Sequence, residues 1–296
     1  MIGRIRNRAE FHPDLRLASM LLPPRLVSRR TLPVMRKLRT ILPSAEDVEV
    51  HQLESGASAR VFRHPGTGAP SPALLWIHGG GYVIGAAAQD DGLCRAFAEK
   101  LAATVVSVDY RLAPDNPYPA ALDDCDATLE WMATQPDIDP ANIAIGGASA
   151  GGGLAAALAL RAADRGGISP VLQLLSYPML DDRSETPDRH HRLWDAQSNR
   201  FGWQSYLGDA DPVTAVPARR ENLSGVAPAW IGVGTLDLFF DEDKRYAERL
   251  EEAGVPCEFV TVPGAFHGFD LVARRAEVSR TYFGSQCDAL RRAFAG

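Results

Sequence analysis

The sequence lacks several features that would assign it to other classes of protein. No continuous apolar run reaches the roughly 20 residues of a transmembrane helix, and the short run Met20–Leu22 is ended by two prolines. The net charge of −6 makes nucleic acid an unexpected partner. We therefore expect no stable membrane insertion, no nucleic-acid binding and a cytoplasmic location.

Cysteine is also scarce, with four residues in 296. The four are far apart, and none forms a C-x-x-C pair or stands at metal-ligand spacing with histidine. We expect reduced, mostly buried thiols and no metal site. The four positions are Cys94, Cys125, Cys257 and Cys287.

Positive charge is concentrated at the start of the chain. Residues 1–40 contain ten Lys or Arg against two acids, a net of +8, which leaves −14 for the rest of a chain whose total is −6. Four prolines argue against a long amphipathic transit helix, and a membrane-surface contact would need a cleaner apolar face. Leu32, Met35, Leu38 and Ile41 or Leu42 recur at helical spacing. Residues 1–45 are therefore predicted to form one or two helices that pack over the domain, and we favour this packing role over a binding role.

Most of the remaining chain alternates between short β-branched or apolar runs and helical patterns. This alternation predicts βαβ units, hence an α/β fold with a mostly parallel sheet flanked by helices. We assign the core to residues 46–180 and 218–296, with a hairpin over 48–64. The predicted strands of the core are 73–77, 104–108, 142–146, 171–177, 229–234 and 257–262, of which 73–77 and 142–146 are expected to be buried.

Residues 181–217 interrupt the alternation, being polar and irregular. They are predicted as a small cap over the strand ends. The aromatic residues of this segment either line a pocket or simply pack the cap: Trp194, Phe201, Trp203 and Tyr206. His190 and His191 are expected at the surface, because no carboxylate or cysteine stands at ligand spacing.

The motif Gly147-Ala148-Ser149-Ala150-Gly151 lies between a predicted strand and a predicted helix. Strand, tight turn and helix form the context in which G-x-S-x-G presents a nucleophilic serine. The alternative is a small-residue turn in which the serine only caps the helix. We favour Ser149 as the nucleophile because other segments supply matching groups.

One matching group is the run His78-Gly79-Gly80-Gly81 at the end of the strand 73–77. Consecutive glycines leave backbone amides unshielded, as an oxyanion hole requires. A merely flexible loop is the weaker alternative. His78 is expected to hold this loop by hydrogen bonding rather than to act as a base.

The other groups follow the last two predicted strands. Asp237 and His267 complete the order Ser…Asp…His that is used on α/β-hydrolase sheets. Asp241 is the rival carboxylate, although it stands in the first turn of a predicted helix, where the helix dipole favours an acid. Glu242 and Asp243 are explained in the same way. The predicted catalytic residues are thus Ser149, Asp237 and His267.

Together these motifs resemble the hormone-sensitive-lipase family of carboxylesterases, from about residue 45 onward. The matching stretches are His78–Gly81, Tyr110–Pro114, Gly147–Gly152, Asp237–Glu242 and His267–Phe269. The resemblance implies an α/β-hydrolase fold with a helical cap. It also implies oxyanion donors at the amides of Gly80, Gly81 and Ala150, with Gly79 as a further candidate, and no cofactor.

The resemblance implies a serine carboxylesterase that acts on short- to medium-chain esters, with a small-molecule ester as partner and a homodimer paired through the last strand. Ala148, Leu238-Phe239 and Asp115 depart from common family residues, which weakens any transfer of substrate preference. A lactonase or amidase with the same triad stays open. So does a hydrolase-fold ligand-binding protein, although none of the three triad positions is replaced.

Overall fold

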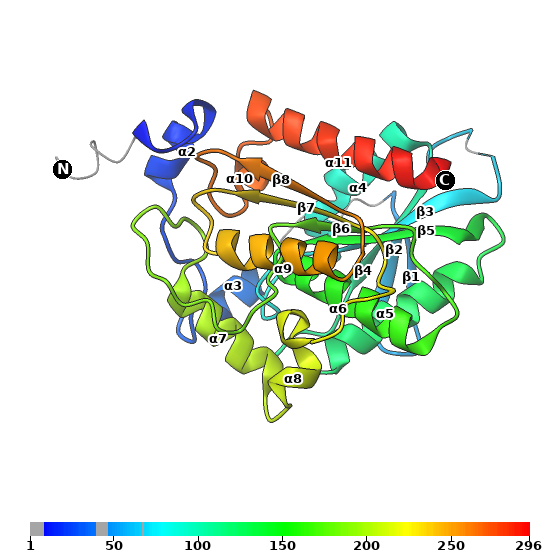
Figure 1. Ribbon diagram of the computed structural model, residues 1–296, viewed down its shortest axis with the longest axis horizontal. Helices are drawn as coiled ribbons and strands as arrows, with labels where there is room; N and C mark the ends of the chain where they lie inside the picture. Colours follow the sequence, from blue (N-terminus) through cyan, green and yellow to red (C-terminus); the bar gives the residue numbers. More distant parts are fainter. Residues whose placement is uncertain (1–8, 40–46, 67) are drawn as a thin grey trace.

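The computed structural model describes residues 9–39, 47–66 and 68–296, and its centre is one eight-stranded sheet (Figure 1). The strand order is β1-β2-β4-β3-β5-β6-β7-β8. β2 is antiparallel to both of its neighbours, and every other pair is parallel. The strands are β1 (Glu49–Gln52), β2 (Ser58–Phe62), β3 (Ser71–Ile77), β4 (Thr104–Asp109), β5 (Ile138–Ala148), β6 (Gln173–Ser176), β7 (Ala229–Gly234) and β8 (Cys257–Val262).

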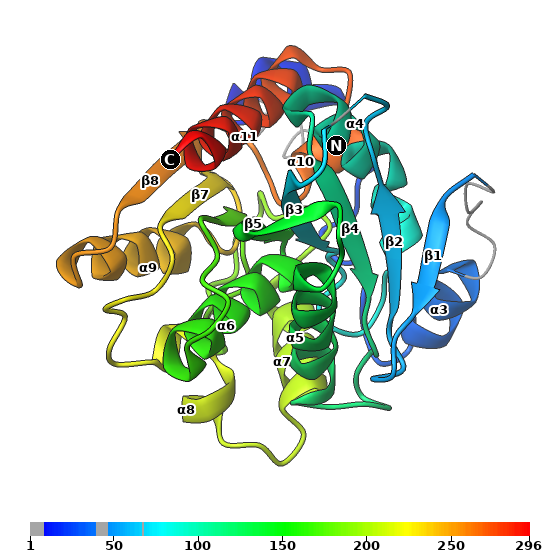
Figure 2. The ribbon, with the colours of Figure 1, turned by 90° about the vertical axis from the view of Figure 1, so that its right-hand side faces the viewer.

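Two groups of helices cover the sheet, as Figure 2 shows. α5 (Ala120–Ala133), α6 (Ala150–Arg165) and α9 (Phe240–Glu252) pack on one face, and α4 (Asp91–Leu101) and α11 (Glu277–Ala295) pack on the other. Buried residues form a hydrophobic cluster on each side. The predicted α/β class and the mostly parallel sheet are therefore confirmed.

Shorter helices lie outside this three-layer core. The N-terminal part contains α2 (Arg16–Leu21) and α3 (Leu32–Arg39), and the segment between β6 and β7 contains α7 (Ala196–Leu207) and α8 (Pro212–Ala215). α10 (Phe269–Val272) follows β8, and 3₁₀ turns occupy Pro13–Leu15, Ala87–Asp90 and Pro217–Arg219. Ile41 and Leu42, predicted to continue the N-terminal helix, lie outside the described residues.

The central strands are buried on both faces, which explains their continuous apolar sequences. In β3 every residue except Pro72 is buried. β5 begins at Ile138, four residues earlier than predicted, because Ile138 pairs with Ser71 before a register shift in the β3–β5 ladder. Asp139, which is charged, and Pro140, which is rare inside strands, concealed this extension in the sequence.

The cysteines agree with a further expectation, and the length and composition of the helices bear on membrane spanning. Cys94, Cys125 and Cys287 are buried free thiols, and Cys257 is half-buried and also free. In the described part of the chain, no helix combines the length and the apolar character needed to span a bilayer.

Candidate active site

Ser149 occupies a strained turn between β5 and α6. Its φ is 56° and its ψ is −121°, in a region that non-glycine residues seldom adopt. Only glycine fits at Gly151, where an added Cβ would lie 2.0 Å from the carbonyl oxygen of Ile77. The Ser149 amide donates a 2.9 Å hydrogen bond to the carbonyl of Ser176 in β6. The sheet therefore holds the serine in an otherwise unfavourable conformation.

Ser149, His267 and Asp237 form a continuous hydrogen-bonded row. Ser149 Oγ lies 3.0 Å from His267 Nε2, and His267 Nδ1 lies 2.9 Å from Asp237 Oδ2. When Nδ1 donates to the carboxylate, Nε2 is left to accept the serine proton. The other Asp237 oxygen accepts a 3.0 Å bond from the Phe239 amide. The row can therefore deliver a nucleophilic alkoxide to a bound carbonyl carbon.

Adjacent strands bring the histidine and the carboxylate together. The loops after β7 and β8 are joined where the Leu236 amide donates to the Ala265 carbonyl at 2.9 Å. The Gly264 amide donates to Thr235 Oγ1 at 2.9 Å, which joins the same two loops again. Asp241, the rival carboxylate, is exposed in the first turn of α9, so Asp237 is the one that contacts the histidine.

Aromatic rings confine the imidazole of His267. The edges of Tyr177 and Phe239 approach it, with centroid distances of 5.0 and 5.1 Å. The Tyr177 hydroxyl in turn donates a 2.7 Å hydrogen bond to Asp270. This packing restricts the ring to the orientation in which both nitrogens have partners.

The glycine loop lies directly against the serine. A Cβ on Gly79 would lie 2.9 Å from the Ala148 carbonyl oxygen, and Gly80 and Gly81 have φ values of 134° and 57°. Within the described chain, no group accepts a hydrogen bond from the amide of Gly80, Gly81 or Ala150. Free amides beside a nucleophile are the donors that a developing oxyanion requires.

His78 does not face the serine. It is fully buried, its Nδ1 lies 2.8 Å from the Gly79 carbonyl oxygen, and its ring stacks on Tyr110 at 4.3 Å. The Tyr110 hydroxyl donates to the His78 carbonyl at 3.0 Å. These contacts hold the start of the glycine loop, as the sequence predicts.

A cavity of about 430 Å³ opens in front of Ser149. Part of its wall comes from the N-terminal segment, through Leu26, Val27 and Met35. The segment therefore lies over the domain and also lines the cavity, which the sequence did not predict. The signal was present as an apolar pair, Leu26-Val27, between prolines and arginines, but no sequence pattern says where such a pair docks.

Some of the aromatic residues of the predicted cap line the cavity, and the others pack the cap; these are the two roles that the sequence left open. Trp194 lines the cavity and covers Gly81, where a Cβ would lie 2.0 Å from the indole ring. Trp203 and Tyr206 pack around Tyr82 instead, and the Tyr82–Tyr206 rings stack at 4.1 Å. Phe201 is partly buried against the same core.

The N-terminal segment is tied to the segment between β6 and β7. Arg25 binds both carboxylate oxygens of Asp195, with its closest contact at 2.8 Å. Ser198 Oγ donates a 3.0 Å hydrogen bond to the carbonyl of Val27, a cavity residue. The two segments therefore form one wall over the carboxyl ends of the strands.

The expectation that His190 and His191 lie at the surface is wrong. Both residues are buried rather than exposed, and for His190 the cover comes from the N-terminal segment, where the Phe11 ring lies 5.6 Å from the His190 ring. Glu242 and Asp243 are also buried, which the helix-dipole explanation of these acids did not address. Their spacing to the buried Tyr246 and Leu250 was the sequence signal for this inward face.

The α/β-hydrolase class is defined by a mostly parallel eight-stranded sheet. This sheet carries a serine on a strand-to-helix turn, followed in the chain by an Asp and a His at the same edge of the sheet. Residues 74–271 match a family model described as alpha/beta hydrolase fold. The chain is 41% identical over 214 residues to "Esterase LipI" of Mycobacterium tuberculosis. The aligned region covers 68% of this chain and 66% of that relative, so the chain spans just under two thirds of the relative's length. It is 36% identical over 250 residues to "Carboxylesterase NlhH" of the same species, which covers 79% of this chain and 77% of the relative.

Solved structures agree with these relatives. "Bacterial Heroin Esterase" superposes with a TM-score of 0.88 at 34% identity, covering 97% of this chain and 99% of that one. The esterase LipW from Mycobacterium marinum gives 0.87 at 33% identity and covers 98% of both chains. The chain therefore belongs to the hormone-sensitive-lipase-like family of α/β-hydrolases, as its motifs predict.

Proposed function

We propose that this protein is a serine carboxylesterase that hydrolyses short- to medium-chain esters through an acyl-enzyme on Ser149. The observation that carries the proposal is the hydrogen-bonded row Ser149–His267–Asp237, which opens on a cavity beside free backbone amides. Relatives named esterase and carboxylesterase support it. At about 430 Å³, the cavity is near the lower end of the roughly 300–1,000 Å³ range of small-molecule sites, which favours small esters over triglycerides.

The proposed reaction has two halves. Ser149 Oγ attacks the carbonyl carbon while His267 Nε2 takes its proton, and the tetrahedral oxyanion faces the amides of Gly80, Gly81 and Ala150. The ester C–O bond then breaks, and His267 gives its proton to the departing alcohol oxygen. Water then attacks the acyl carbon while His267 takes its proton, the bond between the acyl carbon and Ser149 Oγ breaks, and His267 returns the proton to Oγ as the carboxylic acid leaves. Asp237 holds the imidazole tautomer throughout.

We also propose the division of the chain into an N-terminal cap (residues 1–45), a hydrolase core (46–180 and 218–296) and a cap insertion (181–217). The joint wall over the cavity supports this division. A cytoplasmic location and a homodimer stay predictions. The four unpaired thiols support the first of these, because disulfides are rare in reducing compartments.

The test is hydrolysis of p-nitrophenyl esters from acetate to palmitate by the wild type and by Ser149→Ala, with Ser224→Ala, an exposed serine, as the control. We expect activity that is greatest on short chains and that falls by about 10⁴-fold or more in Ser149→Ala. Activity retained in Ser149→Ala would contradict the proposal. If the folded wild type hydrolyses no ester but does hydrolyse lactones or amides, the second reading of the triad replaces the first.

A further inference from the structure

One wall of the active-site cavity carries polar and charged groups that the proposed ester chemistry does not use. Most of the lining is glycine or apolar, but Gln89, Asp90 and Arg274 also face the cavity. Asp90 is only 2% exposed, whereas Arg274 is exposed to solvent. A buried carboxyl group on the wall of a small-molecule cavity needs a physical reason, because burial of a charge without a partner is costly.

Asp90 differs from the adjacent aspartate. Asp91 forms a two-pronged ion pair with Arg60, with contacts of 2.7 and 2.5 Å, and thus has a structural partner. Asp90 accepts a 2.9 Å hydrogen bond from the Trp76 indole through Oδ2 alone. In the described chain Oδ1 of Asp90 has no hydrogen-bond partner, which leaves this oxygen available to a molecule in the cavity.

The surrounding charges favour a cation at this position. Burial raises the pKa of Asp90 to about 6, against the effects of the Trp76 hydrogen bond and of Arg274, while Asp270 and Asp91 add to the rise. Asp270 is a second nearby acid, half-buried, whose Oδ1 accepts a 2.7 Å hydrogen bond from the Tyr177 hydroxyl. Arg274 has no carboxylate at ion-pair distance among the described residues, but its exposure lets water screen its charge.

We propose that the cavity binds esters that carry a protonated amine, with Asp90 as the counter-ion. The ammonium group donates to Oδ1 while the ester carbonyl lies at Ser149. This gives the free carboxyl oxygen a charge-assisted hydrogen-bond partner. The inference rests on the proposed esterase function, because it assigns a substrate class to that same cavity.

The experiment compares each cationic ester with a carbon isostere of the same shape. One pair, dimethylaminoethyl acetate and isoamyl acetate, places the charge on the alcohol. A second pair, ethyl dimethylaminobutyrate and ethyl isoheptanoate, places it on the acyl group. Initial rates at pH 7.5, about the pH of ordinary assays, are followed by titration of the released acid, and the ratio of kcat/KM within each pair is the readout.

We expect the wild type to favour the cationic member of at least one pair, and Asp90→Asn to lower that ratio by about tenfold to a hundredfold. This is the range of a hydrogen bond to a charged group. Arg274→Gln should raise the same ratio by a few-fold, because it removes the competing cation. Arg275→Gln, an exposed neighbour that does not line the cavity, controls for surface charge and should leave the ratio unchanged.

The outcomes separate the two proposals. Equal ratios in wild type and Asp90→Asn, or a preference that Arg274→Gln abolishes, would overturn the amine assignment while leaving the esterase intact. If the wild type hydrolyses none of the esters, the esterase proposal fails, and calorimetric binding of dimethylaminoethyl acetate to Ser149→Ala tests the amine site alone. Loss of that binding in Ser149→Ala/Asp90→Asn supports the site, and equal binding refutes it. Should Asp90→Asn fail to fold, Arg274→Gln decides the question on its own.

Discussion

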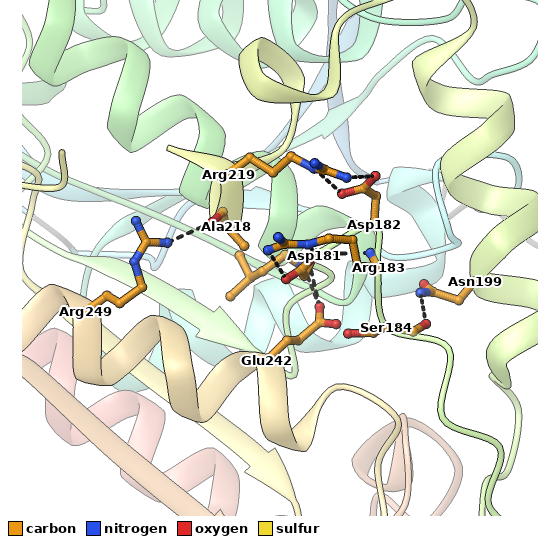
Figure 3. A network of polar contacts seen from close by, with 10 residues as sticks. Asp181, Asp182, Arg183, Ser184, Asn199, Ala218, Arg219, Glu242 and Arg249 are labelled. Carbon is orange, nitrogen blue, oxygen red and sulfur yellow. Dashed lines mark hydrogen bonds and ion pairs between the residues drawn. The ribbon is translucent and has the colours of Figure 1, made fainter. Parts of the chain in front are cut away.

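Glu242 offers a test of the electrostatics beneath the active site. Figure 3 shows it on α9 below the segment Asp181–Ser184, where Oε1 accepts hydrogen bonds from the amides of Leu180 and Asp181 at 2.7 and 3.1 Å. The residue is 2% exposed. Burial raises the pKa of Glu242 from 4.5 to about 8, against the opposing effect of these hydrogen bonds and of the Ser184 hydroxyl. The folded protein therefore keeps a proton at neutral pH that the unfolded chain releases.

Retaining this proton destabilises the folded state as pH rises. At pH 7 the unfolded group is ionised and the folded group is not. The free energy of unfolding is therefore lower by about 3 kcal/mol, because pH 7 lies roughly 2.5 units above the unfolded pKa and each unit corresponds to about 1.4 kcal/mol. This loss of stability is near zero below pH 4.5, the ordinary pKa of a glutamate, and it reaches its full size above pH 8, the pKa in the folded protein. Glu242→Gln keeps the acceptor oxygen and removes the titration, so we expect it to stabilise the protein at pH 7 by up to about 3 kcal/mol.

The assay is urea unfolding of the wild type and Glu242→Gln at several pH values between about 4.5 and 8.5, with Asp241→Asn, the exposed neighbour, as the control. The stability difference should grow with pH for Glu242→Gln and stay flat for Asp241→Asn. Glu242→Ala should instead destabilise, because two backbone amides lose their acceptor. A difference between Glu242→Gln and the wild type that does not change with pH would refute the reasoning.

Three further predictions concern the site itself. Asp237→Asn should lower kcat by about 10⁴-fold with the fold unchanged by circular dichroism, whereas Asp241→Asn should not, and equal effects would contradict the assignment. Gly81→Ala should lower kcat by about 10²-fold or more, because its Cβ would lie 2.0 Å from Trp194, and Trp194→Phe in the same chain should restore part of the loss. Arg25→Ala should raise KM by a few-fold more than it lowers kcat, by releasing the wall at Asp195, with the exposed Arg29→Ala as control.

The proposed triad could be assembled from the sequence because each of its residues stands next to a strand. Ser149 follows β5, Asp237 follows β7 and His267 follows β8, and parallel strands bring their carboxyl ends to one edge. A strand can be recognised from a local apolar run, so the position of the next polar residue follows without any knowledge of distant contacts. The same reasoning placed His78 at the base of the glycine loop.

Burial of charged groups was harder to predict, because a local explanation already accounted for them. The helix dipole favours acids in the first turn of α9, so Glu242 and Asp243 needed no further reason. Only their register with Tyr246 and Leu250 shows that they face inward. His190 was missed for a different reason, since its cover comes from Phe11, about 180 positions earlier in the chain.

The wall of the cavity likewise depends on contacts between segments that are far apart in the sequence. Its parts come from Leu26 and Val27, from Asp90, from Trp194 and from Arg274, and these segments meet only in the folded chain. Changes at these positions need not move Ser149, His267 or Asp237, which are held by the sheet and by the paired loops after β7 and β8. The reaction is therefore encoded locally along the strands, whereas the choice of substrate is encoded in long-range packing. Substitutions in the wall should thus change which ester is preferred before they change how the ester is cleaved.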